Sequence, residues 1–136
     1  MQKVVLDTNV IVSSLIQKNY PYLILDHCIE GNAIICISNE ILHEYLEVLG
    51  RPKFSKFPDF KSNAEFLITL FIYISEIFEP KEILKIIDDD PDNRLLELAK
   101  IADADFIITG NIKDFTMQSF YKTKIVTPKE YWEDYR

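Results

Sequence analysis

Short, uninterrupted runs of aliphatic residues recur along the chain, and they alternate with longer segments whose apolar residues repeat every three or four positions. The short runs predict strands at residues 3–6, 33–37, 105–109 and 124–127. The longer segments predict helices at residues 10–30 with an interruption near Pro21, at 39–49, 62–78 and 92–103, and from Pro128 onwards. Buried strands that alternate with helices predict an α/β fold, with helices on both faces of a central parallel sheet.

The helix predicted at residues 39–49 has clear signals at both ends. Ser38 is a suitable N-cap, and Gly50 follows the last apolar residue of the helical stripe. Two prolines come soon afterwards and disfavour further helix, so we expect a loop over residues 50–60.

The segment 62–78 is apolar on most sides of the helix that it predicts. It is too short, and too often interrupted by polar residues, to span a membrane. A helix of this kind is either deeply buried or in contact with another subunit, and we favour a homodimer contact or a partner groove. The aromatic C-terminal residues 130–136 are expected to pack against the same helix.

The chain has 136 residues, of which 48% are hydrophobic, and this size fits a single domain over residues 1–136 with a sizeable core. Cys28 and Cys36 lack the spacing of a zinc or redox motif, so we expect small buried apolar residues in a reducing compartment. No signal peptide is visible near the first residue. We therefore expect a cytoplasmic protein.

The formal net charge of −7 disfavours a generic nucleic-acid-binding surface, which is normally basic. Two alternatives stay open, because some acids can be neutralised as metal ligands and because the natural partner can be basic. Arg51, Lys53 and Lys56 gather in the loop 50–60. They are the residues expected to contact phosphates, although a solvated loop also accounts for them.

Four polar side chains follow buried strands or begin the helices after them. Asp7 ends the first strand, Glu44 lies one turn into the helix 39–49, and Asp92 heads the buried face of the helix 92–103. Asn111 follows the strand 105–109 through a glycine turn. Ligands of open α/β sheets bind outside the carboxyl ends of the strands, so we expect all four side chains at one rim.

Clustered carboxylates repel one another and raise each other's pKa unless a cation neutralises them. Oxygen ligands suit Mg²⁺ or Mn²⁺, which keep several waters and bind substrate phosphate directly. Such metals activate water and stabilise the leaving oxygen of a phosphodiester. The residues therefore predict a site for Mg²⁺- or Mn²⁺-dependent phosphodiester hydrolysis.

Three ordered segments resemble the PIN-domain family, and in particular its bacterial and archaeal members related to ribonuclease toxins. They read VVLDTNVIVSSL, SNEILHEYLEVLGRPKF and DPDNRLLELAKIADADFIITGNIKDF, and together they cover nearly the whole chain. The resemblance implies a Rossmann-like fold and endoribonuclease activity with Mg²⁺ or Mn²⁺. It also implies that Asp7, Glu44 and Asp92 are the family acids, and that a basic or DNA-binding antitoxin is a partner.

The fourth position departs from the family pattern, because many relatives have Asp where this chain has Asn111. An amide oxygen can still coordinate a metal or hold its water, but it supplies no charge. Asp114 is placed to compensate, and Asp90 to assist from outside the first ligand shell, while Asp88 and Asp89 are expected to be solvated. Polar residues of the same rim are expected to orient water or phosphate, and they are Thr8, Asn9, Ser38 and Thr109.

Structural roles compete with these assignments. Asp7 can bond local amides at a strand end, Asp92 can cap its helix, and Glu44 can belong to a solvated helix face. Asn111 can simply form a turn.

Two further functions stay open besides the nuclease. A PIN fold with Asn111 can bind RNA or protein without cleaving it. Phosphoryl transfer through an aspartate nucleophile needs a second Asp two residues after Asp7 in the haloacid-dehalogenase-like pattern, where this chain has Asn9.

Overall fold

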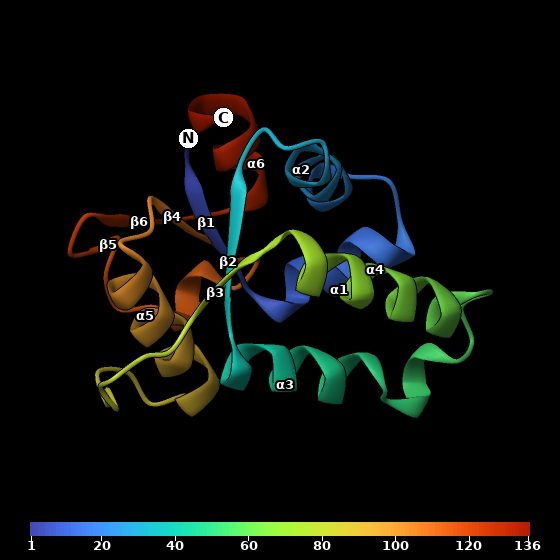
Figure 1. Cartoon of the computed structure of the whole chain (residues 1–136), viewed down its shortest axis with the longest axis horizontal. Helices are drawn as coiled ribbons and strands as arrows, with labels where there is room; N and C mark the ends of the chain where they lie inside the picture. Colours follow the sequence, from blue (N-terminus) through green and yellow to red (C-terminus); the bar gives the residue numbers. More distant parts are fainter.

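A computed structural model describes residues 1–136 as a sheet of six strands with helices on both faces (Figure 1). The strands are β1 (Lys3–Leu6), β2 (Ile34–Ser38), β3 (Glu76–Phe78), β4 (Phe106–Ile108), β5 (Ser119–Phe120) and β6 (Thr123–Val126). Their order is β3-β2-β1-β4-β6-β5, and every neighbouring pair is parallel except β5–β6. The predicted α/β class with a central, mostly parallel sheet is confirmed.

The helices are α1 (Thr8–Ile16), α2 (Tyr20–Ile29), α3 (Asn39–Leu49), α4 (Phe60–Ile74), α5 (Asp90–Ala102) and α6 (Pro128–Glu130). Short 3-10 helices cover Pro52–Phe54 and Ile112–Asp114, and a π-helical turn covers Tyr131–Tyr135. The prediction for residues 39–49 is confirmed, whereas the segment 10–30 forms two helices with Pro21 in the first turn of the second. Figure 1 shows α5 on one side of the sheet and α1, α2 and α4 on the other.

The strand β1 lies inside the sheet between β2 and β4, and its residues Val4, Val5 and Leu6 are fully buried. Leu6 pairs with Ile108, and the ladder continues as the Asp7 amide donates to the Ile108 carbonyl at 3.0 Å. A strand buried on both faces has room for polar residues only beyond its end. This arrangement places Asp7 at the carboxyl edge of the sheet, where α1 and α3 also begin (Figure 1).

The helix predicted at residues 62–78 is too long at its C-terminal end. The helix α4 ends at Ile74, Ser75 is extended, and the next three residues form β3. Ile77 of β3 pairs in parallel with Ile37 of β2. Helical spacing of the apolar residues suggested one continuous helix, but pairing with the otherwise free edge of β2 satisfies the backbone of both strands and prevails over local propensity.

The aromatic C-terminal segment does not pack as expected against α4. Its Tyr131 ring lies edge-on to Phe106 of β4, with ring centroids 5.3 Å apart, and Trp132 lies edge-on to His27 of α2 at 5.6 Å. The strand β6 runs parallel to β4 and ends at the carboxyl edge of the sheet, so the segment after it turns back towards the amino edge, where Tyr131 donates its hydroxyl to Gln2. The segment therefore covers α2 and the start of β4.

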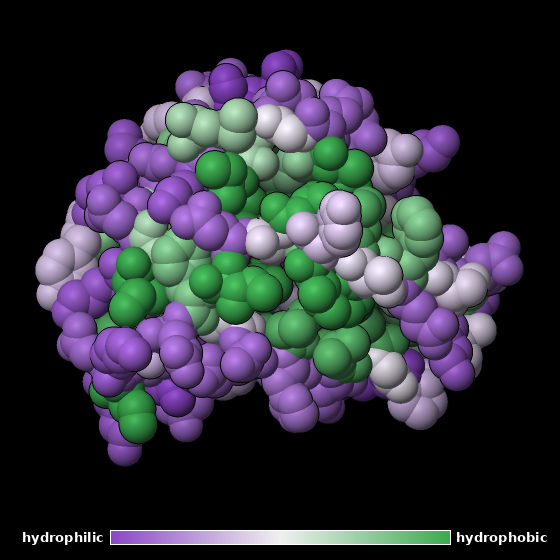
Figure 2. All heavy atoms as spheres, in the orientation of Figure 1, coloured by the Kyte–Doolittle hydropathy of each residue, from purple (hydrophilic) through white to green (hydrophobic).

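Several apolar side chains of α4 and β3 stay exposed to solvent. Phe66 is 70% exposed, Tyr73 89% and Ile77 57%. Figure 2 shows hydrophobic residues gathered over β3 and the neighbouring part of α4 on the face turned to the viewer. None of the helices has the length and apolar character needed to cross a membrane.

Candidate active site

Acidic side chains line a cavity of about 340 Å³ at the carboxyl edge of the sheet, which we call the acid pocket. Its polar lining residues are Asp7, Thr8, Asn9, Glu44, Arg51, Asp89, Asp92, Asn111 and Asp114. They lie where β1 passes into α1, on α3 and just after it, at the start of α5, and after β4. The four residues expected at one rim therefore lie around one cavity.

Asp7 is held by hydrogen bonds to both of its carboxylate oxygens. Its Oδ1 accepts from the Thr8 amide at 2.7 Å, which caps α1, and its Oδ2 accepts from the Thr109 hydroxyl at 2.7 Å. Burial raises the pKa of Asp7, while these hydrogen bonds oppose the rise. Capping and a ligand role are compatible, because a carboxylate has four lone-pair directions and two remain for other partners.

The turn after β4 is fastened to α1 by side-chain hydrogen bonds. Asn9 Oδ1 accepts from the Gly110 amide at 2.9 Å, and Thr109 Oγ1 accepts from the Asn111 amide at 3.0 Å. A Cβ at Gly110 would lie 3.1 Å from Asn9 Oδ1, so this close approach favours glycine. Thr109 thus links Asp7 to Asn111 through a single hydroxyl.

Glu44 is carried by α3, whose start is capped by Ser38. The Ser38 hydroxyl accepts from the Ile41 amide at 3.2 Å, and Ser38 is buried away from the acid pocket. The neighbouring Tyr45 is fully buried and donates its hydroxyl to the Leu6 carbonyl, which fixes α3 against the end of β1. Burial and repulsion from nearby acids raise the pKa of Glu44.

Asp92 lies in the first turn of α5 and is only 7% exposed. Burial, followed by repulsion from acids that include Asp7 and Asp89, raises its pKa to about 7. Asp92 does not cap the helix, because α5 begins at Asp90 and Asp89 Oδ1 accepts from the Asp92 amide at 3.1 Å. Asp89 is exposed to solvent as expected, and it has a further role that was not predicted, because it caps α5 and lines the acid pocket.

A buried polar contact that the sequence analysis missed holds the loop before α5. Asn93 is 1% exposed, accepts from the amides of Ile86 and Ile87 at 3.1 and 3.0 Å, and donates to the Ile87 carbonyl at 2.7 Å. Glu97, one turn later, accepts from the Leu84 amide at 2.7 Å. Two polar residues four positions apart beside an apolar stripe are the sequence signal for such a contact.

The other expected site residues are divided between the acid pocket and its surroundings. Asp90 is exposed and does not line the pocket, and neither does Lys56, whose ammonium lies over the Phe57 ring. Arg51 does line it and pairs with Glu47 of α3, with Nη2 2.9 Å from Oε2. Arg51 is the one basic side chain of the pocket lining, which otherwise contains five carboxylates.

The donors of the acid pocket fit a hard divalent cation. Carboxylate and amide oxygens are the ligands that Mg²⁺ and Mn²⁺ take. The pKa of Asp92 is raised first by burial and then by repulsion from the neighbouring acids, and a bound cation would oppose both effects. The side chains do not form a closed shell, because no group of three or more His, Cys, Asp or Glu residues is arranged to hold an ion. Asp7, Glu44 and Asp92, which all line the acid pocket, are the residues that could hold one.

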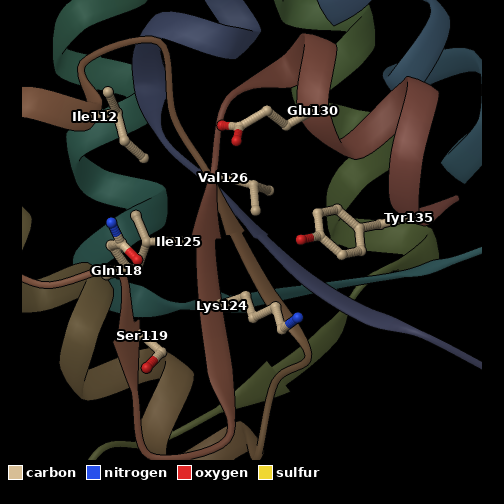
Figure 3. Close-up of a pocket in the computed structure, with 8 residues that line it drawn as sticks. All are labelled: Ile112, Gln118, Ser119, Lys124, Ile125, Val126, Glu130 and Tyr135. Carbon is tan, nitrogen blue, oxygen red and sulfur yellow. The ribbon is translucent and has the colours of Figure 1, made fainter.

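A larger cavity of about 490 Å³ lies elsewhere, between β6 and the C-terminal turn (Figure 3). Figure 3 shows Glu130 and Tyr135 on one side of it and Lys124 on β6. It shares no lining residue with the acid pocket, and its single carboxylate accepts a hydrogen bond from the Thr127 amide as part of a helix cap. Size alone does not mark the chemical site, because the clustered acids lie in the smaller cavity.

Fold and acid pocket together define an α/β protein with a site at the carboxyl edge of its parallel sheet. Residues 3–113 match the family model of the PIN domain, so the chain belongs to the PIN-domain family. This confirms the family resemblance seen in the sequence. PIN domains are generally nucleases, which supports a hydrolase at this coarse level.

Two individual proteins are similar to this chain. The uncharacterized protein MJ1680 of Methanocaldococcus jannaschii is 31% identical in an alignment of length 142, which covers 98% of this chain and 91% of the relative. A chain in the crystal structure of VapBC2 from Rickettsia felis, bound to a DNA fragment from their promoter, superposes with a TM-score of 0.59. That match covers 93% of this chain and 98% of the other at 18% identity, so it supports the fold.

Proposed function

We propose that the protein is a metal-dependent endoribonuclease of the PIN type. The observation that carries this proposal is the convergence of Asp7, Glu44 and Asp92 on one small cavity, at a cost in burial and electrostatic repulsion that a divalent cation would offset. When bound, Mg²⁺ or Mn²⁺ supplies the Lewis acid for phosphodiester hydrolysis.

The side chains of the pocket then have separate tasks. Asp7 and Asp92 hold the ion, and Glu44 binds the ion or orients its water. Thr109 positions Asp7 through the 2.7 Å hydrogen bond, and Asn111 completes the shell with an uncharged oxygen. Thr8, Asn9 and Asp114 support the site from its rim.

Arg51 is proposed to bind substrate phosphate. Its guanidinium is the basic group of the pocket lining, and the pair with Glu47 holds it in place. Guanidinium groups suit phosphate because they donate two parallel hydrogen bonds. Lys53, which lines a neighbouring cavity together with Arg51, extends this contact along the RNA backbone.

Cleavage of single-stranded RNA in Mn²⁺ or Mg²⁺ tests the proposal. We expect cleavage by the natural chain, and we expect its loss in Asp7→Asn and in EDTA. Asp26→Asn removes an acid from the exposed side of α2 and serves as the matched control, with activity retained. Cleavage that survives both Asp7→Asn and EDTA would refute metal-dependent catalysis at this site.

A binding module without turnover is the second candidate, and Asn111 favours it because the amide removes one negative charge from the pocket. Isothermal titration with Mn²⁺ and cleavage assays on varied RNAs separate the two functions. Metal binding without cleavage supports the binding module, whereas increased cleavage by Asn111→Asp supports a weakened nuclease.

We also propose an antitoxin protein with a basic or DNA-binding character as a partner. The net charge of −7 and the acidic cavity favour a basic partner. The similar VapBC2 structure from Rickettsia felis is bound to a DNA fragment. Inhibition of RNA cleavage by the product of a neighbouring gene would support the pairing, and an inert neighbour would contradict it.

A homodimer through the exposed face of α4 and β3 is proposed as well, because the large side chains of Tyr73 and Ile77 are exposed to solvent there. Sedimentation of the natural chain and of Tyr73→Ser tests this contact, and a monomeric natural chain contradicts it.

Cys28 and Cys36 are free, and burial raises the pKa of each thiol to about 12, which fits inert thiols in the cytoplasm.

A further inference from the structure

Another cavity, of about 510 Å³, adjoins the acid pocket along α1, and we call it the adjoining cavity. Both cavities are lined by Thr8, Asn9, Arg51 and Asn111. The two cavities are therefore immediate neighbours, and Arg51 is placed to contact a ligand in either of them.

The adjoining cavity differs from the acid pocket in its chemistry. Its remaining lining contains no carboxylate, and Val12 of α1, Val48 of α3 and Phe54 supply apolar surface. Phe54 is mostly buried: its ring stacks on Phe60, with ring centroids 4.9 Å apart, and the Lys53 ammonium lies 5.2 Å from its centroid, so it forms a fixed part of the wall. Apolar walls are suited to the flat, apolar faces of a nucleobase.

The charged side chains that line the adjoining cavity determine whether it attracts an anion or a cation. Arg51 and Lys53 both line the adjoining cavity, which has no acidic lining residue of its own. Two cations attract a phosphate and repel the basic segment expected from an antitoxin. Charge complementarity and continuity with the acid pocket therefore both favour an anionic occupant with apolar faces.

We propose that the adjoining cavity binds the nucleotide next to the scissile phosphodiester of single-stranded RNA. The base packs against Val12, Val48 and Phe54, and Arg51 contacts the phosphate at the junction between the two cavities. A base paired in a duplex is stacked on both sides and does not reach these walls, so the cavity selects single strands. The choice of RNA as ligand rests on the function proposed above.

Binding measured without catalysis tests the proposal. The probe is a fluorescent pentaribonucleotide in EDTA, with fluorescence anisotropy as the readout. Val12→Trp fills the cavity and is expected to weaken binding by about tenfold, the order of one stacked base. Leu46→Trp makes the same kind of change in a separate apolar groove between α3 and α4 and is expected to leave the Kd unchanged.

A probe that lacks its central base completes a double-mutant cycle. We expect this abasic probe to bind the natural chain weakly and to show no further loss with Val12→Trp, because both changes remove the same contact. Equal losses on intact and abasic probes, no loss on either, or equally tight binding of duplex RNA would overturn the proposal. A thermal melt of each variant checks that it is folded. If Val12→Trp is unfolded, Val12→Gln replaces it, because glutamine fills less of the cavity than tryptophan but makes its wall polar.

The same samples keep the two proposals apart. If RNA is cleaved in Mn²⁺ but Val12→Trp does not change its affinity, the nuclease proposal stands and the nucleotide subsite is rejected. RNA that is never cleaved, but whose affinity depends on Val12 and on the central base, supports the subsite and rejects the nuclease.

Discussion

Replacement of Asp92 by Asn is expected to stabilise the metal-free protein at neutral and alkaline pH. The side chain is 7% exposed and faces other acids, and its pKa is raised from 3.8 to about 7. A raised acid pKa means that the folded state binds the proton more tightly than the unfolded state. Ionisation of Asp92 therefore costs stability, and Asn keeps the shape of the side chain without the charge.

The magnitude follows from the size of the shift. About three pKa units at about 1.4 kcal/mol each amount to about 4 kcal/mol, and we take roughly half of this because the pocket opens to solvent. The loss of a charge near the helix start offsets about 0.5 kcal/mol. A net gain of roughly 1.5 kcal/mol corresponds to about 5 °C in Tm for a domain of this size.

The pH dependence gives the prediction its sign. The favourable contribution of protonated Asp92 is fully present below the unfolded pKa of about 4 and is lost as pH rises through about 7. The advantage of Asp92→Asn is therefore small at pH 5 and full at pH 8.

Thermal melts in EDTA at pH 5 and pH 8 measure this difference. Asp90→Asn, on the exposed side of the same helical turn, is the matched control, with an expected effect within about 0.5 kcal/mol at either pH. Millimolar Mn²⁺ is expected to raise the Tm of the natural chain more than that of Asp92→Asn. An Asn variant that is less stable at pH 8, or equally shifted at both pH values, would refute the electrostatic reasoning.

Three other outcomes follow from the same structure. Thr109→Val removes the hydrogen bond that lowers the pKa of Asp7, so the acid limb of the pH–rate profile should move to higher pH, with kcat reduced by about tenfold or more. Asn93→Ala leaves the amides of Ile86 and Ile87 without partners, and we expect a loss of about 2–3 kcal/mol in urea unfolding, with faster proteolysis of the preceding loop. Far-ultraviolet circular dichroism and tyrosine fluorescence should report one coincident unfolding transition, as expected for a single domain.

The sequence predicts the parts of the fold that carry strong local signals. The helix 39–49 has an N-cap, an amphipathic stripe and a terminal glycine, and the structure reproduces its bounds. The strand β3 has only three residues and follows a helix whose apolar spacing it continues. Its conformation is decided by pairing with β2, more than thirty residues away in sequence, and no local pattern encodes such a contact.

The candidate site shows the same division. The placement of Asp7, Glu44 and Asp92 around one cavity follows from the rule that parallel strands end at one edge. The capping role of Asp89 was missed because three acids in a row resemble a solvated turn, although Pro91 in the first turn signals a cap one or two residues before it. The adjoining cavity depends on how α1, α3 and the loop after α3 meet, which only the packed structure defines.

Each acid of the pocket has a neighbour in sequence that performs a structural task. Leu6 accepts the buried hydroxyl of Tyr45, so the residues beside Asp7 and Glu44 hold β1 and α3 together, and Asn93 beside Asp92 anchors the preceding loop. The framework of the pocket therefore rests largely on these neighbours, although Asp7 and Asp89 also cap the helices α1 and α5. A descendant of this chain can exchange Glu44 or Asp92, lose its chemistry and keep this framework, which leaves a scaffold free to acquire a role in binding alone.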